Sequence, residues 1–309
     1  MDVYDSVVIG AGPGGMTAAL YLCRFGLRTA MLEKLTPGGQ MLSTFEIGNY
    51  PGFPEGTPGW NLADNLAAHL KGYALDHFAR EALELRSHDN LHFIKAEQGE
   101  IASRTVIVCS GAKPRKLGLA DEERLTGRGV SYCAMCDGMF FKNKVVAVVG
   151  GGNAAIEEAL HLSNLVQKLY LVHRRDDFRA DKVYRDKLAH HMGNIELVMG
   201  YVVESLNGGD SLTGITIAPT GGGAPRILDV SGMFVFIGTE PANTFLPPGV
   251  ETDEYGFIVT DCEMRTGIPG LYAAGDIRSK RCRQVVTAVG DGATAANAVF
   301  EYLERMPED

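Results

Sequence analysis

Apolar and polar positions repeat one arrangement twice along the 309-residue chain. The apolar run at residues 6–9 predicts a buried strand, residues 16–23 carry apolar side chains at helical spacing, and residues 29–32 predict a second strand. Residues 145–149, 156–163 and 169–172 repeat the same order. A strand, a helix and a second strand in close succession indicate a parallel pair joined by a crossover helix.

A glycine motif follows the first strand of each copy directly. The first motif fits GxGxxG with Gly10, Gly12, Pro13 and Gly15, and the second fits GxGxxA over residues 150–155, with Gly150, Gly152, Asn153 and Ala154 as its expected binding residues. In this fingerprint the first glycine makes a tight turn, the second lets the backbone approach a pyrophosphate, and the third lets the helix pack on the strand. The N-terminus of the helix then attracts the phosphates. We therefore expect an α/β protein with two Rossmann-like dinucleotide-binding domains.

An acidic residue ends the second strand of the first copy. Glu33, with Lys34 beside it, lies 33 − 10 = 23 residues after Gly10. A carboxylate at this position can accept both hydroxyls of a ribose. An incidental surface acid is the alternative, and the spacing alone does not distinguish FAD from NAD.

The second copy has a basic cluster at the equivalent position. His173 lies 173 − 150 = 23 residues after Gly150, and Arg174, Arg175 and Arg179 follow it. A guanidinium offers paired donors to a 2'-phosphate, which a carboxylate would repel. The cluster therefore favours NADP over NAD, although a solvated charged face is an alternative interpretation.

A pair of cysteines lies between the two copies, at Cys133 and Cys136, followed by Asp137. The chain has 6 Cys and no second CxxC, which argues against both a disulfide scaffold and a complete zinc site, so we expect no metal. A CxxC at a helix start suits reversible disulfide chemistry. Asp137 could exchange the proton that this chemistry requires, or could serve as an N-cap or turn carboxylate.

These parts together favour FAD at the first nucleotide site. NADPH delivers a hydride, whereas a disulfide is opened by thiolate exchange, so a mediator between the two is expected. FAD can fill that role.

Net charge excludes some other classes. Lys and Arg number 29 against 38 Asp and Glu, a net charge of -9, which argues against binding to nucleic acid or to anionic membranes. No apolar run approaches the ~20 residues of a bilayer span, and the acidic start at residues 1–5 is unlike a signal peptide. We expect a cytoplasmic protein.

The motifs as a set resemble those of the low-molecular-weight, bacterial-type thioredoxin reductases of the class II pyridine nucleotide-disulfide oxidoreductases. The most specific match is Cys133-Ala134-Met135-Cys136-Asp137-Gly138 placed before the second glycine motif, and the resemblance runs nearly end to end. It implies electron transfer from NADPH through FAD to a Cys133–Cys136 disulfide and on to thioredoxin, in a homodimer. It also implies that Cys136 faces the flavin, that Cys133 attacks the protein substrate and that Asp137 is the acid/base.

The same resemblance implies further flavin contacts and a domain division. Residues 36–40, 49–52, 271–276 and 283–285 resemble the flavin-contacting segments of the family. Among them the expected FAD residues are Gly38, Gly39, Gln40, Asn49, Gly275, Asp276, Arg283, Gln284 and Val285, together with Gly111. Asp276 would hold the ribityl chain. The FAD domain would comprise residues 1–112 and 245–309, with the NADPH and disulfide domain, residues 113–244, inserted in it.

Two other functions stay open at this stage. One is an NADPH-dependent flavin disulfide reductase that serves a different dithiol protein. The other is a redox-sensing nucleotide-binding protein without turnover.

Overall fold

A computed structural model describes residues 2–44 and 47–306, apart from the side chains of Ser43, Met135 and Cys136. It divides the chain into two compact units, one formed by Met1–Lys113 with Glu240–Asp309 and the other by Pro114–Thr239. The connecting segments contain β7 (Ala112–Pro114) and β16 (Thr239–Pro241), which pair with each other. One unit is thus inserted in the other.

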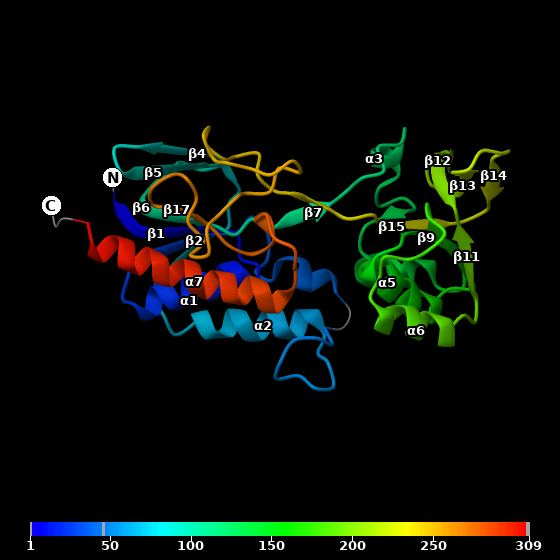
Figure 1. Ribbon diagram of the computed structural model, residues 1–309, viewed down its shortest axis with the longest axis horizontal. Coiled ribbons are helices and arrows are strands. Elements are labelled where there is room, and N and C mark those ends of the chain that lie inside the picture. The colour runs from blue at the N-terminus through cyan, green and yellow to red at the C-terminus, as the bar shows by residue number, and fades with distance from the viewer. Residues whose placement is uncertain (1, 45–46, 307–309) are drawn as a thin grey trace. The chain divides into compact units, whose positions relative to one another are not determined.

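The first unit is built on a mixed sheet in the order β3-β2-β1-β6-β5-β4, with β17 beside β6 (Figure 1). Its parallel strands are β1 (Val3–Ile9), β2 (Thr29–Leu32), β3 (Leu75–Phe78), β6 (Glu100–Val108) and β17 (Leu271–Ala273). β4 (Ala82–His88) and β5 (Leu91–Ala96) continue the sheet as an antiparallel meander. Residues 79–99 have little hydrophobic pattern, so the sequence did not predict this meander.

Helices cover one face of this sheet. Figure 1 shows α1 (Pro13–Arg24), α2 (Gly59–Leu70) and α7 (Val285–Glu304) on the same side. Val8 of β1 belongs to the core under these helices, whereas Val7 and Ile9 belong to the core on the opposite face. The continuous apolar run of β1 reflects this burial on both faces, which is typical of parallel strands.

α1 and α7 pack closely through glycines. A Cβ atom at Gly292 would overlap the carbonyl oxygen of Gly14 and would lie 3.1 Å from the nitrogen of Ala18. Short 3-10 segments, η1 (Gly39–Ser43) and η3 (Gly275–Ile277), lie in the loops that lead to these helices.

The inserted unit has a parallel sheet in the order β11-β10-β9-β15-β8. Its strands are β8 (Val130–Ser131), β9 (Val145–Gly150), β10 (Lys168–His173), β11 (Ile195–Met199) and β15 (Gly232–Phe236). α5 (Asn153–Ser163) and α6 (Lys182–His190) pack on one face, and an antiparallel sheet packs on the other (Figure 1). That sheet consists of β12 (Tyr201–Gly208), β13 (Leu212–Pro219) and β14 (Arg226–Leu228), while α3 (Glu122–Leu125), α4 (Ala134–Asp137) and η2 (Gly138–Phe141) are short.

The predicted α/β class with two Rossmann-like units is confirmed. In both units the strand before the glycine motif is central, with β1 between β2 and β6 and β9 between β10 and β15. The chain order of the strands reverses at these positions. Ligands of open α/β sheets bind outside the carboxyl ends of the strands at such a switch point. The fold therefore places both glycine turns where a dinucleotide would bind.

Candidate active site

The turn between β1 and α1 can be made only with glycine at two of its three motif positions. Gly10 has a φ of +103°, and a Cβ there would lie 2.8 Å from the carbonyl carbon of Cys109. A Cβ at Gly15 would overlap the carbonyl oxygen of Gly10. Gly12, in contrast, has an ordinary φ of -70°, and nothing lies within 4 Å of where its Cβ would be. The open space at Gly12 is what a pyrophosphate approaching the backbone requires.

The carboxylate of Glu33 is fixed beside this turn. One oxygen, Oε2, accepts the N–H of Ala11 at 2.9 Å, and the other, Oε1, accepts the N–H of Leu35 at 3.0 Å. Each carboxylate oxygen keeps further acceptor capacity, which fits a ribose diol. Lys34 instead forms an exposed ion pair with Glu81 at 3.0 Å.

A second glycine loop rests on the first. The N–H of Gly38 donates to the carbonyl of Ala11 at 2.8 Å, and a Cβ at Gly39 would lie 3.1 Å from the Cα of Gly12. The amide of Gln40 donates to the carbonyl of Ala112 at 3.2 Å, directly after Gly111. Gly38 and Gly39 therefore lie against the first glycine turn, and Gln40 joins this loop to the segment at Ala112.

Two more predicted flavin residues meet at the N-terminus of α7. The amide of Asn49 donates to Oε1 of Gln284 at 2.8 Å, across a sequence separation of 235 residues. Gln284 is the N-cap of α7 and forms a reciprocal capping box with Thr287, and Val285 is the first residue of the helix. The start of α7 is thereby fixed in the same unit as the glycine turn.

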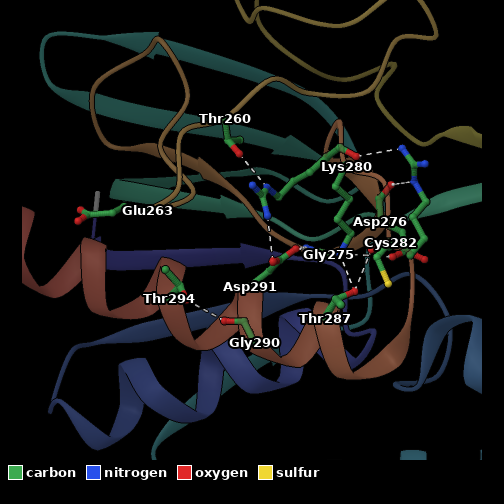
Figure 2. Close-up of polar contacts among 12 residues, drawn as sticks. Thr260, Glu263, Gly275, Asp276, Lys280, Cys282, Thr287, Gly290, Asp291 and Thr294 are labelled. Atoms are coloured by element: carbon green, nitrogen blue, oxygen red, sulfur yellow. Dashed lines mark hydrogen bonds and ion pairs between the residues drawn. The ribbon is translucent and has the colours of Figure 1, made fainter. Parts of the chain in front are cut away.

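Asp276 in η3 has an unsatisfied buried oxygen. Its Oδ1 has no hydrogen-bond partner, and the nearest ion-pair partner is Nζ of Lys280 at 3.8 Å (Figure 2). Burial raises the pKa of this carboxyl group, although Lys280 and Arg283 act in the opposite direction. Because buried polar atoms nearly always have partners, the free acceptor fits a hydroxyl of a bound ligand.

Arg283 is held by backbone oxygens. Its guanidinium donates to the carbonyls of Asp276 and Arg278 at 3.3 Å and 3.1 Å. The same group lies 3.8 Å from the ring centroid of Phe257. Together with the open space at Gly12 and the free Oδ1 of Asp276, this arrangement fits a bound FAD.

The glycine turn of the inserted unit has the same geometry. Gly150 has a φ of +152°, and a Cβ there would lie 3.0 Å from the carbonyl carbon of Phe236. Nothing lies within 4 Å of where a Cβ of Gly152 would be. The ring of His173 packs directly against Gly151 and is stacked on Phe178 at 5.7 Å. Here too the middle position is open toward a phosphate.

His173 is a packing residue of this turn. It is buried, its Nε2 has no hydrogen-bond partner, and burial lowers the pKa of its imidazole, with the neighbouring arginines acting in the same direction. A neutral ring beneath the turn is therefore expected at neutral pH.

The three arginines after His173 are exposed. Within the described part of the chain, Arg174, Arg175 and Arg179 make no side-chain ion pair, and the N–H of Arg179 donates to the carbonyl of Gly151 at 2.8 Å. Their guanidinium groups are thus available to an anion beside the turn, as a 2'-phosphate would be.

Asn153, at the start of α5, is engaged within the protein. Its amide nitrogen donates to Oδ2 of Asp181 at 2.7 Å, and its amide oxygen accepts the N–H of Asp181 at 2.7 Å. Ala154 beside it is exposed. Asn153 therefore anchors the segment before α6 to the glycine turn.

The thiol motif lies at the start of α4. Cys133 is disulfide-bonded, while Cys23, Cys109, Cys262 and Cys282 are free. The side chain of Cys136 lies outside the described part of the chain, so the expected Cys133–Cys136 pairing stays a prediction.

Asp137 is held by a serine that sequence reasoning missed. The hydroxyl of Ser131 donates to Oδ2 of Asp137 at 2.6 Å and accepts the N–H of Cys133 at 3.1 Å. Asp137 ends α4 and is the N-cap residue of η2, but its carboxylate makes no capping hydrogen bond there. Ser131 precedes the CxxC by two residues at the end of β8, a position that only the fold shows to be close to Asp137.

A second network missed from the sequence fixes the residue before Cys133. The hydroxyl of Tyr132 donates to Oε1 of Glu122 at 2.6 Å. The buried carboxylate of Glu122 also accepts the N–H groups of Leu117, Gly118 and Leu119 at 2.8, 2.7 and 3.2 Å. Burial alone would raise the pKa of Glu122, but these donors outweigh it and lower the pKa. The thiol loop therefore starts from a rigid anchor.

Neither a metal centre nor a membrane helix is found within residues 2–44 and 47–306. No group of three or more His, Cys, Asp or Glu side chains there could hold a metal ion. No helix in that part is both long and apolar enough to cross a bilayer.

Comparison with known proteins identifies the class. The model of the pyridine nucleotide-disulphide oxidoreductase family matches residues 4–292. The chain is 42% identical over 308 residues to the thioredoxin reductase of Listeria innocua, covering 99% of this chain and 96% of the relative. It belongs to the pyridine nucleotide-disulphide oxidoreductase family.

Solved structures agree. Lactococcus lactis thioredoxin reductase has a TM-score of 0.94 at 39% identity, covering 98% of this chain and all (100%) of that one. T. acidophilum thioredoxin reductase has a TM-score of 0.91 at 31% identity, covering 97% and 99%. The resemblance to the low-molecular-weight thioredoxin reductases is thereby confirmed. The chain is an NADPH-dependent flavoprotein oxidoreductase with FAD and NADPH as cofactors.

Proposed function

We propose that this chain is a thioredoxin-disulfide reductase, which passes electrons from NADPH through FAD to a Cys133–Cys136 disulfide and then to thioredoxin. The observation that carries the proposal is the disulfide-bonded Cys133 beside a fixed Asp137, in the unit that also contains the second glycine turn. Relatives named thioredoxin reductase that match nearly the whole chain support the choice of substrate.

FAD is held by the first unit, with its pyrophosphate at the turn of Gly10, Gly12, Pro13 and Gly15 and its ribose at Glu33. The remaining FAD residues are Lys34, Gly38, Gly39, Gln40, Asn49, Gly111, Gly275, Asp276, Arg283, Gln284 and Val285. NADPH is held by the inserted unit through Gly150, Gly152, Asn153, Ala154, His173, Arg174, Arg175 and Arg179. FAD, when bound, accepts a hydride from a reduced nicotinamide and passes the electron pair on to a disulfide.

The thiols carry the electron pair to the protein substrate. The reduced Cys133 thiolate attacks one sulfur of the thioredoxin disulfide, forming a mixed disulfide and releasing the other thioredoxin sulfur as a thiolate. Cys136 then attacks Cys133, which restores the internal disulfide and releases dithiol thioredoxin. Asp137, oriented by Ser131, exchanges the protons that the sulfur atoms gain and lose.

We also propose that the protein is a homodimer and acts in the cytoplasm. The family resemblance supports the dimer, and reducing conditions in the cytoplasm suit a reductase that uses NADPH. Sedimentation equilibrium of the holoprotein tests the dimer directly, and a monomer at micromolar concentration would refute it.

A spectroscopic experiment tests the proposed function. The purified protein should carry a yellow flavin that NADPH bleaches without oxygen, and it should then reduce thioredoxin. Cys133→Ser should leave flavin reduction intact and abolish thioredoxin reduction, because the attacking thiol is gone. Cys262→Ser, which changes an exposed free thiol, is the matched control and should keep both steps.

The outcomes of this experiment also test the alternative functions. A protein with no flavin would overturn the proposal. A protein whose flavin is reduced by NADPH but which reduces a different dithiol protein in place of thioredoxin would overturn the choice of substrate alone.

A further inference from the structure

A buried cluster of charged residues links η3 to α7. The carboxylate of Asp291 pairs with Arg278 and with Lys280 at 2.9 Å each. It also accepts the N–H of Gly275 at 3.1 Å, and Figure 2 labels Asp291, Lys280 and Gly275. Arg278 also donates to the hydroxyl of Thr260 at 2.7 Å. Every charged group of this cluster is therefore tied to a partner.

The charged side chains of this cluster are almost fully buried. Side-chain exposure is 11% for Arg278 and 12% for both Lys280 and Asp291. Charges removed from water in this way are stable only when they are paired. Two cations share the single carboxylate of Asp291, so the cluster carries a surplus of positive charge that another anion can balance.

Asp276 is that anion. Nζ of Lys280 lies 3.8 Å from Oδ1 of Asp276, in addition to its bonds to Asp291 and to the hydroxyl of Thr287 at 3.2 Å. Arg283 is also near, but its guanidinium donates to carbonyl groups. Lys280 is thus the cation that joins the two carboxylates.

We propose that Lys280, held in place by Asp291, is a positioning residue for FAD, because its charge keeps Asp276 ionised as a hydrogen-bond acceptor in the cofactor site. The inference rests on the proposed placement of FAD at Asp276. A carboxylate accepts hydroxyl hydrogens at both oxygens, whereas a protonated carboxyl loses part of that capacity.

The surroundings of Asp276 determine the direction of the effect. Burial raises the pKa of Asp276 and Asp291 also raises it, while Lys280 and Arg283 lower it. Residues 13–23 of α1, which also packs on η3, carry no charged side chain, and neither does β17. Removal of the Lys280 charge should therefore move the protonation of Asp276 to higher pH.

The test measures FAD release from diluted holoprotein by the recovery of flavin fluorescence, over roughly pH 5 to 9, where an altered carboxyl group can titrate. In Lys280→Met the Kd for FAD should rise about 10-fold at neutral pH, a change of one decade in affinity. Affinity should fall further as the pH falls, and more steeply than in the wild type. Lys280→Arg should restore most of the affinity, since it keeps the charge.

A double variant distinguishes the proposed effect of Lys280 on Asp276 from a merely structural role of Lys280. Asp276→Asn cannot be protonated in this range, so adding Lys280→Met to it should cause little further loss. An equal loss in both backgrounds, or an unchanged pH dependence in Lys280→Met, would overturn the inference. Lys168→Met, which removes an exposed lysine paired with Glu196, is the matched control and should bind FAD as the wild type does.

Failure of the proposed function has a different signature. Wild-type protein that binds no FAD would refute the proposed function. Wild-type protein that binds FAD and reduces thioredoxin, with a Lys280→Met variant indistinguishable from it, would refute only the role of Lys280.

Discussion

Gly12→Ala should separate cofactor binding from folding. Gly12 adopts a φ of -70° and a ψ of -177°, which any residue accepts, and nothing lies within 4 Å of the new methyl group. A Gly→Ala change at such a position stabilises the folded protein by about 0.4 to 1 kcal/mol, because it lowers the conformational entropy of the unfolded chain. The folded protein should therefore be at least as stable as the wild type.

The same methyl group occupies the space through which the pyrophosphate of FAD approaches the backbone. Displacing the phosphate would weaken one or two charge-assisted hydrogen bonds, each worth about 1.5 to 3 kcal/mol. The expected result is a Kd for FAD raised about 10- to 100-fold. Flavin release on dilution measures this change, and urea unfolding of the flavin-stripped protein measures stability.

Gly15→Ala is the contrasting variant. Its Cβ would overlap the carbonyl oxygen of Gly10 and lie 3.2 Å from Cβ of Cys109, so the turn must shift. Overpacking of this kind costs about 1 to 3 kcal/mol of stability. The reasoning would be refuted if Gly12→Ala kept wild-type FAD affinity, or if it were destabilised as much as Gly15→Ala.

Three further changes test other parts of the molecule. Ser131→Ala removes the donor that orients Asp137, so kcat for thioredoxin reduction should fall about 10-fold, while NADPH still reduces the flavin. Replacing Arg174 and Arg175 together with Ala should lower kcat/KM for NADPH about 100-fold and change that for NADH about 2-fold. Burial lowers the pKa of His92 to about 4 from 6.5, so its neutral form contributes stability above about pH 6.5 that is lost as the pH falls toward 4. His92→Gln should remove about 3 kcal/mol of that pH dependence, measured by urea titration.

Each of these changes has a result that would contradict it. Unaltered thioredoxin turnover in Ser131→Ala would mean that Asp137 needs no orientation. Equal losses with both nicotinamides would mean that the arginines do not recognise a 2'-phosphate. An acid transition that is the same in His92→Gln and the wild type would assign the lost stability to other groups.

The parts of the site that the sequence predicted are those set by local geometry. Glycine is needed at positions 10 and 150 because the backbone has positive φ there. Such a constraint is local, so a short stretch of sequence is enough to reveal it. The position of His173 relative to Gly150 follows from the fixed length of a strand–helix–strand unit. Even so, the sequence placed His173 beside the phosphate site without indicating that its ring packs under Gly151.

The parts that were missed depend on how the elements pack in the assembled fold. Ser131 lies close to Asp137 in sequence, but its role depends on the direction in which β8 ends. Lys280 meets Asp291 only because η3 packs on α7, and a lysine in a loop has no pattern that marks it as buried. Burial of charge is a property of the assembled fold, so sequence periodicity could not predict it.

The packing of α7 on α1 also sets the order in which the two compact units can be completed during synthesis. α1 leaves the ribosome early and α7 late, yet the contact between Gly14 and Gly292 needs both helices. The inserted unit, Pro114–Thr239, has all of its core in one continuous stretch. It can therefore finish folding before α7 is available to pack on α1. A substitution at Gly292 that prevents this packing should leave the inserted unit folded and the first unit incompletely folded.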